Sequence, residues 1–152
     1  MYDKNPWRGL VKICIDTVIF IDILKDEYPK TQEKFYDALE NGHILVSSVI
    51  SVAELMPQFK GNRKELITFL KDHHIKVMDV DIESTLTASE RWMRYLNKKK
   101  AKQCPSCKTS IPGRDQILAD FLIGGFAVTH CDRILTRDRG VYRTYFRDLE
   151  NL

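Results

Sequence analysis

The sequence predicts a single α/β domain, in which a central, mostly parallel sheet of four or five strands lies between two layers of helices. Its 152 residues suit one domain and are enough to bury a sizeable core. A hydrophobic content of 43% is too high for a disordered chain. Short β-rich runs alternate with longer helical runs, the pattern of a parallel sheet covered on both faces. No internal repeat or linker is visible, so residues 1–152 are expected to form one unit.

The first β-rich run, 10–15, ends at Asp16, and a largely apolar helix is expected over 17–25. Tyr28-Pro29 interrupts the chain before a second helix over 31–40, which stops at Asn41-Gly42. Further strands are expected at 43–46, 75–78 and 133–136, and the last six residues are expected to form a short edge strand. Further helices are expected at 49–56, 62–74, 81–100, 115–128 and 142–146.

Two later segments differ from the rest in character. The helix over 81–100 is expected to bury an apolar stripe of Leu86, Trp92, Met93 and Leu96. The segment 98–113 is polar and basic, contains two prolines, and is expected to be a loop or small insertion.

The net charge of +3 conceals an asymmetry along the chain. Residues 1–90 carry 11 Lys and Arg against 15 Asp and Glu, whereas residues 91–152 carry 13 against 6. Such a basic C-terminal part suggests a polyanionic or membrane partner. No uncharged run approaches the ~18 residues of a membrane helix, and Asp16 and Asp22 interrupt the apolar run 13–24. A cytoplasmic protein without a membrane partner is therefore expected.

Four acidic residues are expected at one edge of the sheet. Ligands of open parallel sheets bind where the strands end. Asp16 follows the first strand, Glu54 lies about two turns into the helix after the second, Asp120 lies early in an apolar helix, and Asp138 follows the fourth. Gathered together, these carboxylates would repel one another, and a divalent cation would relieve the repulsion. Oxygen ligands without nearby His or Cys favour Mg²⁺ or Mn²⁺ over zinc.

Each acid also has a purely structural interpretation. Asp16 could only cap the helix that begins at Thr17, Glu54 could be a solvated helix residue, and Asp138 could be a turn residue. Asp120 lies between Ala119 and Phe121, where a buried carboxylate needs a partner or a metal.

Four blocks of the sequence resemble the acidic motifs of the PIN domain family, in the family's order and over roughly residues 10–147. The first block begins at Asp16-Thr17 and the second ends at Glu54-Leu55. The third contains Ala119-Asp120-Phe121, and the fourth includes Thr136-Arg137-Asp138. The resemblance implies a three-layer α/β/α fold and a metal-dependent ribonuclease whose products carry 5′-phosphate and 3′-hydroxyl ends. It most often implies the toxin (VapC-type) half of a toxin–antitoxin pair, with RNA as substrate and an antitoxin protein as partner.

On this resemblance Asp16, Glu54, Asp120 and Asp138 are the catalytic and metal-binding residues, with Asp16 and Asp120 as the leading direct ligands of Mg²⁺ or Mn²⁺. Thr136 matches a frequent Ser/Thr of the family's site, and Thr17 and Thr136 are expected to support the acids. Val18 stands where the family often has Asn or Ser. Because a haloacid-dehalogenase-type phosphatase needs Asp at that place, Val18 also argues against that class.

Basic residues near the acids are expected to contact RNA phosphates. The expected contacts are Arg91, Arg94, Lys98, Lys99, Lys100, Arg137 and Arg139. The alternative is a solvated helix end whose lysines favour the helix dipole. Trp92 and Tyr95 could stack on bases, although residues at this helical spacing more often belong to a core.

Cys104-Pro-Ser-Cys107 has the spacing of half a structural zinc site. Two copies of the chain could complete a four-cysteine site in a homodimer, whereas Cys14 and Cys131 lie in apolar runs and are expected to be core residues. The alternative is a flexible loop with two ordinary thiols.

Two other functions stay open: a PIN nuclease of RNA processing or ribosome maturation, and a non-catalytic module that binds RNA or protein.

Overall fold

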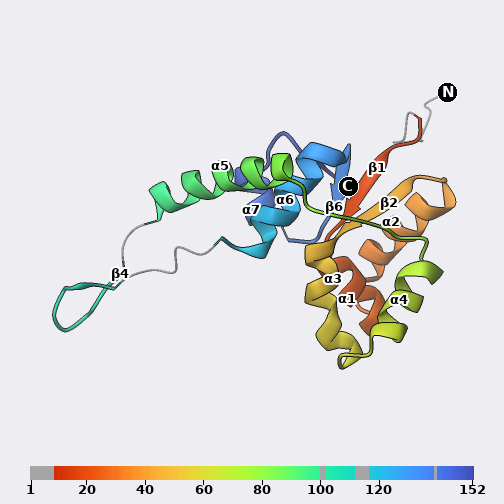
Figure 1. Ribbon diagram of the computed structural model, residues 1–152, viewed down its shortest axis with the longest axis horizontal. Helices are drawn as coiled ribbons and strands as arrows, with labels where there is room; N and C mark the ends of the chain where they lie inside the picture. Colours follow the sequence, from red (N-terminus) through yellow and green to blue (C-terminus); the bar gives the residue numbers. More distant parts are fainter. Residues whose placement is uncertain (1–8, 100–101, 112–116, 139) are drawn as a thin grey trace.

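A computed structural model describes residues 9–99, 102–111, 117–138 and 140–152. Its central sheet has five parallel strands in the order β3-β2-β1-β6-β7. The strands are β1 (Lys12–Ile15), β2 (Ile44–Ser48), β3 (Lys76–Met78), β6 (Arg133–Leu135) and β7 (Glu150–Asn151). The predicted α/β architecture is confirmed, and the short edge strand at the C-terminus is part of the sheet (Figure 1).

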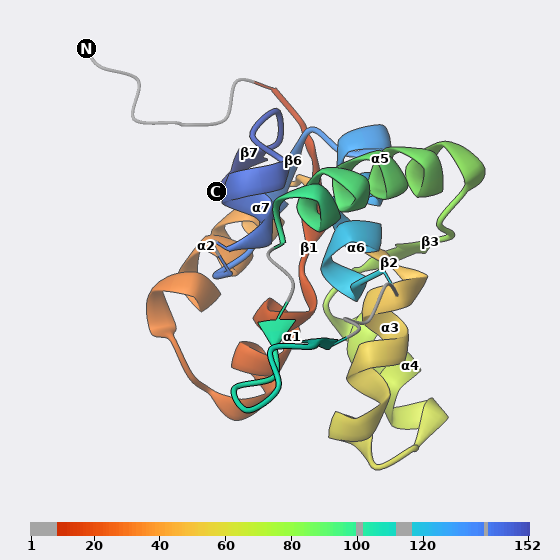
Figure 2. The same ribbon diagram turned by 90° about the vertical axis from the view of Figure 1, so that its left-hand side faces the viewer.

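The two faces of the sheet are covered by different helices. On one face lie α1 (Thr17–Lys25), α2 (Pro29–Glu40), α3 (Val49–Leu55) and α4 (Arg63–Asp72), with a short 3₁₀ helix η1 (Met56–Phe59) between the last two. On the other lie α5 (Ile82–Lys98), α6 (Ala119–His130) and α7 (Val141–Tyr145). Figures 1 and 2 show the sheet between these two layers.

Alternation along the strands builds the two cores. In β1, Ile13 and Ile15 point to the layer of α1–α4, whereas Cys14 points to the layer of α5–α7. In β2, Leu45 and Val46 divide in the same way. Because both faces are buried, these strands consist of continuous apolar runs.

Several element boundaries differ from the sequence prediction. Helix α2 begins at Pro29 rather than after it, because proline suits the first helical position, where its missing N–H costs nothing. Ser47 and Ser48 are the last residues of β2 rather than the residues that follow it, and Ser48 also caps α3. Helix α6 runs from Ala119 to His130. Of its expected first residues, 115 and 116 lie outside the described residues, and Ile117 and Leu118 are not helical.

The predicted apolar stripe of α5 is partly wrong. Leu86 and Met93 are each 53% exposed, and the buried face consists of Ser84, Ala88 and Trp92. Helix α6 approaches so closely that a Cβ on Gly125 would lie 2.7 Å from the Cβ of Ala88. Small residues face α6 at this close approach for this reason, and Leu86 and Met93 turn outward.

The segment 98–113 is not a plain loop. It contains two short strands, β4 (Lys102–Gln103) and β5 (Ser110–Ile111), which pair as an antiparallel hairpin. Residues 100–101 and 112–113 of this segment lie outside the described residues. None of the described helices is long and apolar enough to cross a membrane.

Candidate active site

The four acids predicted from the sequence line one cavity of about 520 Å³ at the C-terminal edge of the sheet. Asp16 follows β1, Glu54 comes from α3, Asp120 from the first turn of α6, and Asp138 from the loop after β6. Thr17, Val18, Ile21 and Arg137 complete the lining. The parallel topology therefore brings together carboxylates that are separated by up to 122 residues in the chain.

Asp16 is the most enclosed of the four, with 4% of its surface exposed. Its Oδ1 accepts a hydrogen bond from the backbone N–H of Thr17 at 2.8 Å, so it does cap α1. Its Oδ2 accepts from the Thr136 hydroxyl at 2.7 Å, and the Tyr142 hydroxyl lies 3.3 Å from Oδ1. The same carboxylate thus serves the helix cap and the cavity.

The pKa of Asp16 is raised to about 6: burial is the largest cause, the negative charges of Asp120 and Glu54 add to it, and the hydrogen bonds from Thr136 and Thr17 oppose it. Burial also raises the pKa of Asp120, with Asp138 and Glu54 adding to the effect through their charge. These mutual repulsions show that the four carboxylates share one electrostatic environment. Perturbed acids in a cavity are typical of functional sites.

Two hydroxyl groups orient the acids. The Thr17 hydroxyl donates a 2.8 Å hydrogen bond to Oε1 of Glu54, which links α1 to α3. The Thr136 hydroxyl bonds Asp16 and also accepts the backbone N–H of Asp138 at 3.0 Å. Thr136 therefore connects the first and the fourth acid directly.

Arg137 is held at this cavity by a residue that the sequence analysis did not select. Its Nε and Nη2 each donate a 2.9 Å hydrogen bond to the carboxylate of Asp22, which is completely buried. Its guanidinium carbon lies 3.8 Å from the ring centroid of Tyr28, in a cation–π contact. Asp22 and Tyr28 thus fix a positive charge beside the acids.

Asp22 and Tyr142 are the two site residues that sequence reasoning missed. Asp22 lies six residues after Asp16 within an apolar run, and a charge at such a position indicates a buried partner. Tyr142 follows Asp138 by four residues and reaches Asp16 from α7. Only the fold reveals its partner.

The predicted basic residues divide into different environments. Arg91 makes two hydrogen bonds of 2.6 and 2.7 Å to Asp148 and a third to the carbonyl of Tyr145, so its side chain joins α5 to the C-terminal segment. Lys98 and Lys99 lie over the rings of Tyr145 and Tyr95. Arg94 is exposed, whereas Lys100 and Arg139 lie outside the described residues.

Trp92 and Tyr95 belong to the core side of α5. Their rings stack at 4.9 Å between centroids, and both contact Phe121. Trp92 is only 6% exposed, which favours the core interpretation over base stacking.

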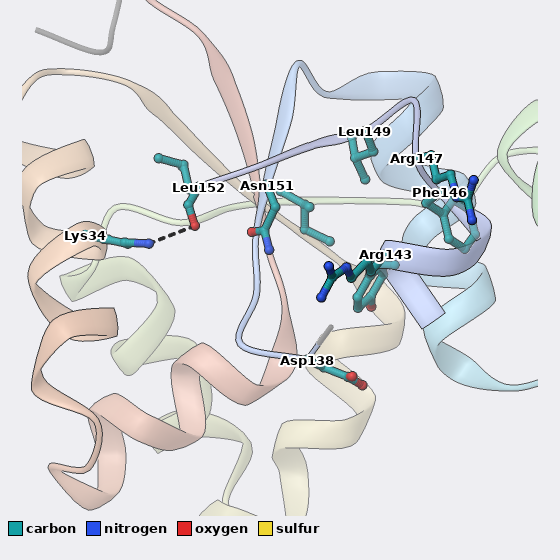
Figure 3. A pocket seen from close by; sticks show the side chains of 10 residues that line it. Lys34, Asp138, Arg143, Phe146, Arg147, Leu149, Asn151 and Leu152 are labelled. Atoms are coloured by element: carbon teal, nitrogen blue, oxygen red, sulfur yellow. Dashed lines mark hydrogen bonds between the residues drawn. The ribbon is translucent and has the colours of Figure 1, made fainter. Parts of the chain in front are cut away.

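A second pocket adjoins the acidic cavity, because Asp138 lines both. Its lining includes Lys34, Arg143 and Arg147, and Figure 3 shows Arg143 projecting into it from α7. Lys34 donates a 3.0 Å hydrogen bond to the carbonyl oxygen of Leu152, while Arg143 and Arg147 are exposed. An acidic cavity therefore borders a basic one.

The donor set of the acidic cavity fits a hydrated Mg²⁺ or Mn²⁺. All four titratable ligands offer oxygen, and neither His nor Cys lines the cavity. Among the described residues no three His, Cys, Asp or Glu side chains form a ready-made ligand cage. Mg²⁺ does not need one, because it keeps several waters and binds through one or two carboxylates.

The chain is therefore an α/β domain with a parallel sheet, whose C-terminal edge carries an acidic cavity beside an anchored arginine. The profile of the PIN domain family matches residues 13–147, and the chain belongs to this family. A comparison with curated protein sequences gives no match.

Solved structures share the fold. The chain is similar to VapBC2 from Rickettsia felis bound to a promoter DNA fragment, with a TM-score of 0.65, 15% identity, and coverage of 93% of this chain and 97% of that one. It is similar to DNA-bound VapBC from Salmonella typhimurium, with a TM-score of 0.64, 15% identity, and coverage of 94% and 98%. It is also similar to FitAcB from Neisseria gonorrhoeae, with a TM-score of 0.59, 19% identity, and coverage of 92% of this chain and 96% of that one. The predicted family and fold are thereby confirmed.

Proposed function

We propose that the protein is a metal-dependent endoribonuclease that hydrolyses RNA phosphodiester bonds and acts in the cytoplasm as the toxin of a toxin–antitoxin pair. The observation that carries the proposal is the convergence of four carboxylates in one cavity of a PIN domain. The structural neighbours include VapBC complexes and a toxin–antitoxin complex from Klebsiella pneumoniae, which supports the partner class.

Asp16 and Asp120 are the proposed direct ligands of Mg²⁺ or Mn²⁺, because burial and mutual repulsion leave these two carboxylates with the greatest need of a cation. Glu54 and Asp138, both more exposed, are proposed to orient the waters around the ion. When bound, such an ion lowers the pKa of a coordinated water and offsets charge on the phosphodiester.

The chain's own residues position the reacting groups. Thr17 and Thr136 hold Glu54 and Asp16 in fixed orientations. Arg137 offers positive charge at the cavity, and Arg143 and Arg147 extend it into the neighbouring pocket along a path for the RNA backbone. Water attacks phosphorus in line, the bond from phosphorus to the 3′-oxygen breaks, and that oxygen takes up a proton. The fragments end in 5′-phosphate and 3′-hydroxyl.

The test is divalent-dependent cleavage of a panel of RNAs by the purified protein. Asp16→Asn and Asp120→Asn are each expected to lower the rate by more than about 100-fold. Asp72→Asn is the matched control, since Asp72 is an exposed carboxylate at the end of α4, away from the cavity. Undiminished cleavage by either cavity variant overturns the assignment.

The toxin role needs a separate measurement. Expression of the parent chain is expected to arrest growth, and Asp16→Asn is expected to remove the arrest. Co-expression of an antitoxin encoded next to the gene is expected to relieve it. Cleavage of RNA without growth arrest would instead indicate a nuclease of RNA processing, and binding of RNA without cleavage would indicate a non-catalytic module.

A further inference from the structure

The hairpin between α5 and α6 carries the two cysteines that the acidic site does not use. Strands β4 and β5 pair through Lys102 with Ile111 and Gln103 with Ser110, and the turn between them contains Cys104 and Cys107. Figure 1 places this hairpin beyond the end of α5, away from the sheet, and Figure 2 shows it from its own side. The turn is therefore presented outward rather than packed into the core.

The turn has a closed backbone geometry. The N–H of Cys104 donates to the carbonyl of Thr109 and the N–H of Lys108 donates to the carbonyl of Cys104, both at 2.9 Å. Lys108 adopts the left-handed conformation, with φ of 59°, which reverses the chain directly after Cys107. This geometry places Cys104 and Cys107 in the same short turn, at the spacing of a pair of zinc ligands.

A hydroxyl group lies within hydrogen-bonding distance of the sulfur of Cys107. The hydroxyl oxygen of Thr109 lies 3.2 Å from the Sγ of Cys107. Thiolates are the form in which cysteine binds zinc, and hydrogen bonds to the sulfur are typical supports of such a site.

Two thiolates are half of what a structural zinc ion requires. Among the described residues no further His, Cys, Asp or Glu side chain lies close enough to complete a metal site with these two cysteines. Cys14 is buried in β1, where its thiol interacts with Cys131, and His130 lies 2.7 Å from Asp81. His43 accepts the backbone N–H of Val11. The missing ligands must therefore come from outside these residues.

We propose that Cys104 and Cys107 form half of a structural zinc site, which the same two cysteines of a second copy of this chain complete. A tetrahedral site with four cysteine ligands divides naturally into two equal pairs, and a twofold dimer supplies two identical pairs. Because the hairpin extends beyond the end of α5 and away from the sheet, its turn is accessible to a second copy of the chain.

Charge also favours two copies of this hairpin. Four thiolates around Zn²⁺ leave a net charge of −2, which needs nearby cations. Lys108 is exposed directly beside Cys107, and the sequence from Lys98 to Ile111 contains five lysines and no acidic residue. The lysines of two such segments offset the negative charge of the zinc site. In turn, that negative charge reduces the repulsion between the two sets of lysines.

The experiment measures zinc content and mass on the full chain, purified under reducing conditions. Metal analysis is expected to give one zinc for every two chains, and light scattering after size exclusion is expected to give a dimer. Cys104→Ser/Cys107→Ser is expected to lose the zinc and run as a monomer. Because these residues lie in an exposed turn, its circular dichroism is expected to match that of the parent.

Ser106→Ala is the matched control, since Ser106 is an exposed residue of the same turn and has no thiol. It is expected to keep both the zinc and the dimer. Removal of zinc from the parent with a strong chelator is expected to yield monomers that return to dimers on addition of zinc. Replacement by Co²⁺ is expected to give the visible absorption of a tetrahedral thiolate site, which the double variant lacks.

Several outcomes overturn the proposal. Protein without zinc, or one zinc in each monomer, excludes a site shared by two copies. A dimer that survives both chelation and the double substitution is held together elsewhere. A protein that binds no zinc when reduced, and that forms an intramolecular disulfide between Cys104 and Cys107 on oxidation, would show a redox pair instead. None of these measurements depends on nuclease activity, so the proposed function is tested separately.

Discussion

Arg137 and Asp22 form a two-pronged ion pair, in which Nε and Nη2 each lie 2.9 Å from a different carboxylate oxygen. The pair is asymmetric, because the Arg137 side chain is 34% exposed whereas that of Asp22 is fully buried. The asymmetry decides which residue can remain charged when its partner is removed. The partly exposed guanidinium of Arg137 can be solvated by water, whereas the buried carboxylate of Asp22 cannot.

Arg137→Met is therefore expected to destabilise the protein more than Asp22→Asn. Removal of one partner of a buried ion pair costs about 3–5 kcal/mol when the remaining charge stays buried. Arg137→Met is expected in that range, and Asp22→Asn below it. Urea unfolding of both variants measures the difference. Equal losses, or a greater loss for Asp22→Asn, would contradict the assignment of the buried charge to Asp22.

Thr136→Val is expected to weaken divalent binding while it leaves the fold intact. The Thr136 hydroxyl is one of the two groups that hold the pKa of Asp16 down, so its loss makes the ionised carboxylate less favourable. We expect the Mn²⁺ concentration that raises the melting temperature half-maximally to increase about tenfold. Thr136→Ser keeps the hydroxyl and serves as control. The same Mn²⁺ dependence in Thr136→Val and the parent would refute the role of this hydrogen bond.

The acids of the site could be predicted from the sequence because their positions follow from topology. Asp16 comes directly after a strand, and Asp138 follows another, so a parallel sheet must bring them to the same edge. Asp22 and Tyr142 could not be found this way, because they meet their partners only when α1, α7 and the loop after β6 have packed.

The error in α5 has a different origin. Hydrophobic periodicity assumes that large apolar side chains face the core. At the contact with α6 the approach of the backbones decides instead, and Gly125 faces Ala88 where larger residues do not fit. The distance between two packed helices depends on the tertiary structure, and the hydrophobic periodicity of a single sequence does not encode it.

Arg143 and Arg147 are expected to bind RNA through its phosphates. In the background of Asp16→Asn, which keeps the substrate intact, Arg143→Gln and Arg147→Gln are each expected to weaken binding uniformly across RNA sequences. Each is also expected to reduce the slope of log affinity against log salt by about 0.7 for single-stranded RNA. Arg63→Gln, an exposed change at the start of α4, is the control. Weaker binding with an unchanged salt slope would speak against phosphate contact.

The metal-free protein is expected to lose stability as the pH rises from 4 to 6, because Asp16 must ionise while buried among other acids. Its pKa is about 6 in the folded chain against an ordinary value of 3.8, so the folded state binds more protons in this window than the unfolded state. The free energy of unfolding therefore falls with rising pH, by about 2 kcal/mol from this group between pH 4 and 7. Asp16→Asn lacks the ionisation and should become more stable relative to the parent by that amount between pH 4 and 7. Urea unfolding in the presence of a chelator, at pH 4, 5, 6 and 7, measures the difference, and a difference that does not change with pH would rule out Asp16 as the titrating group.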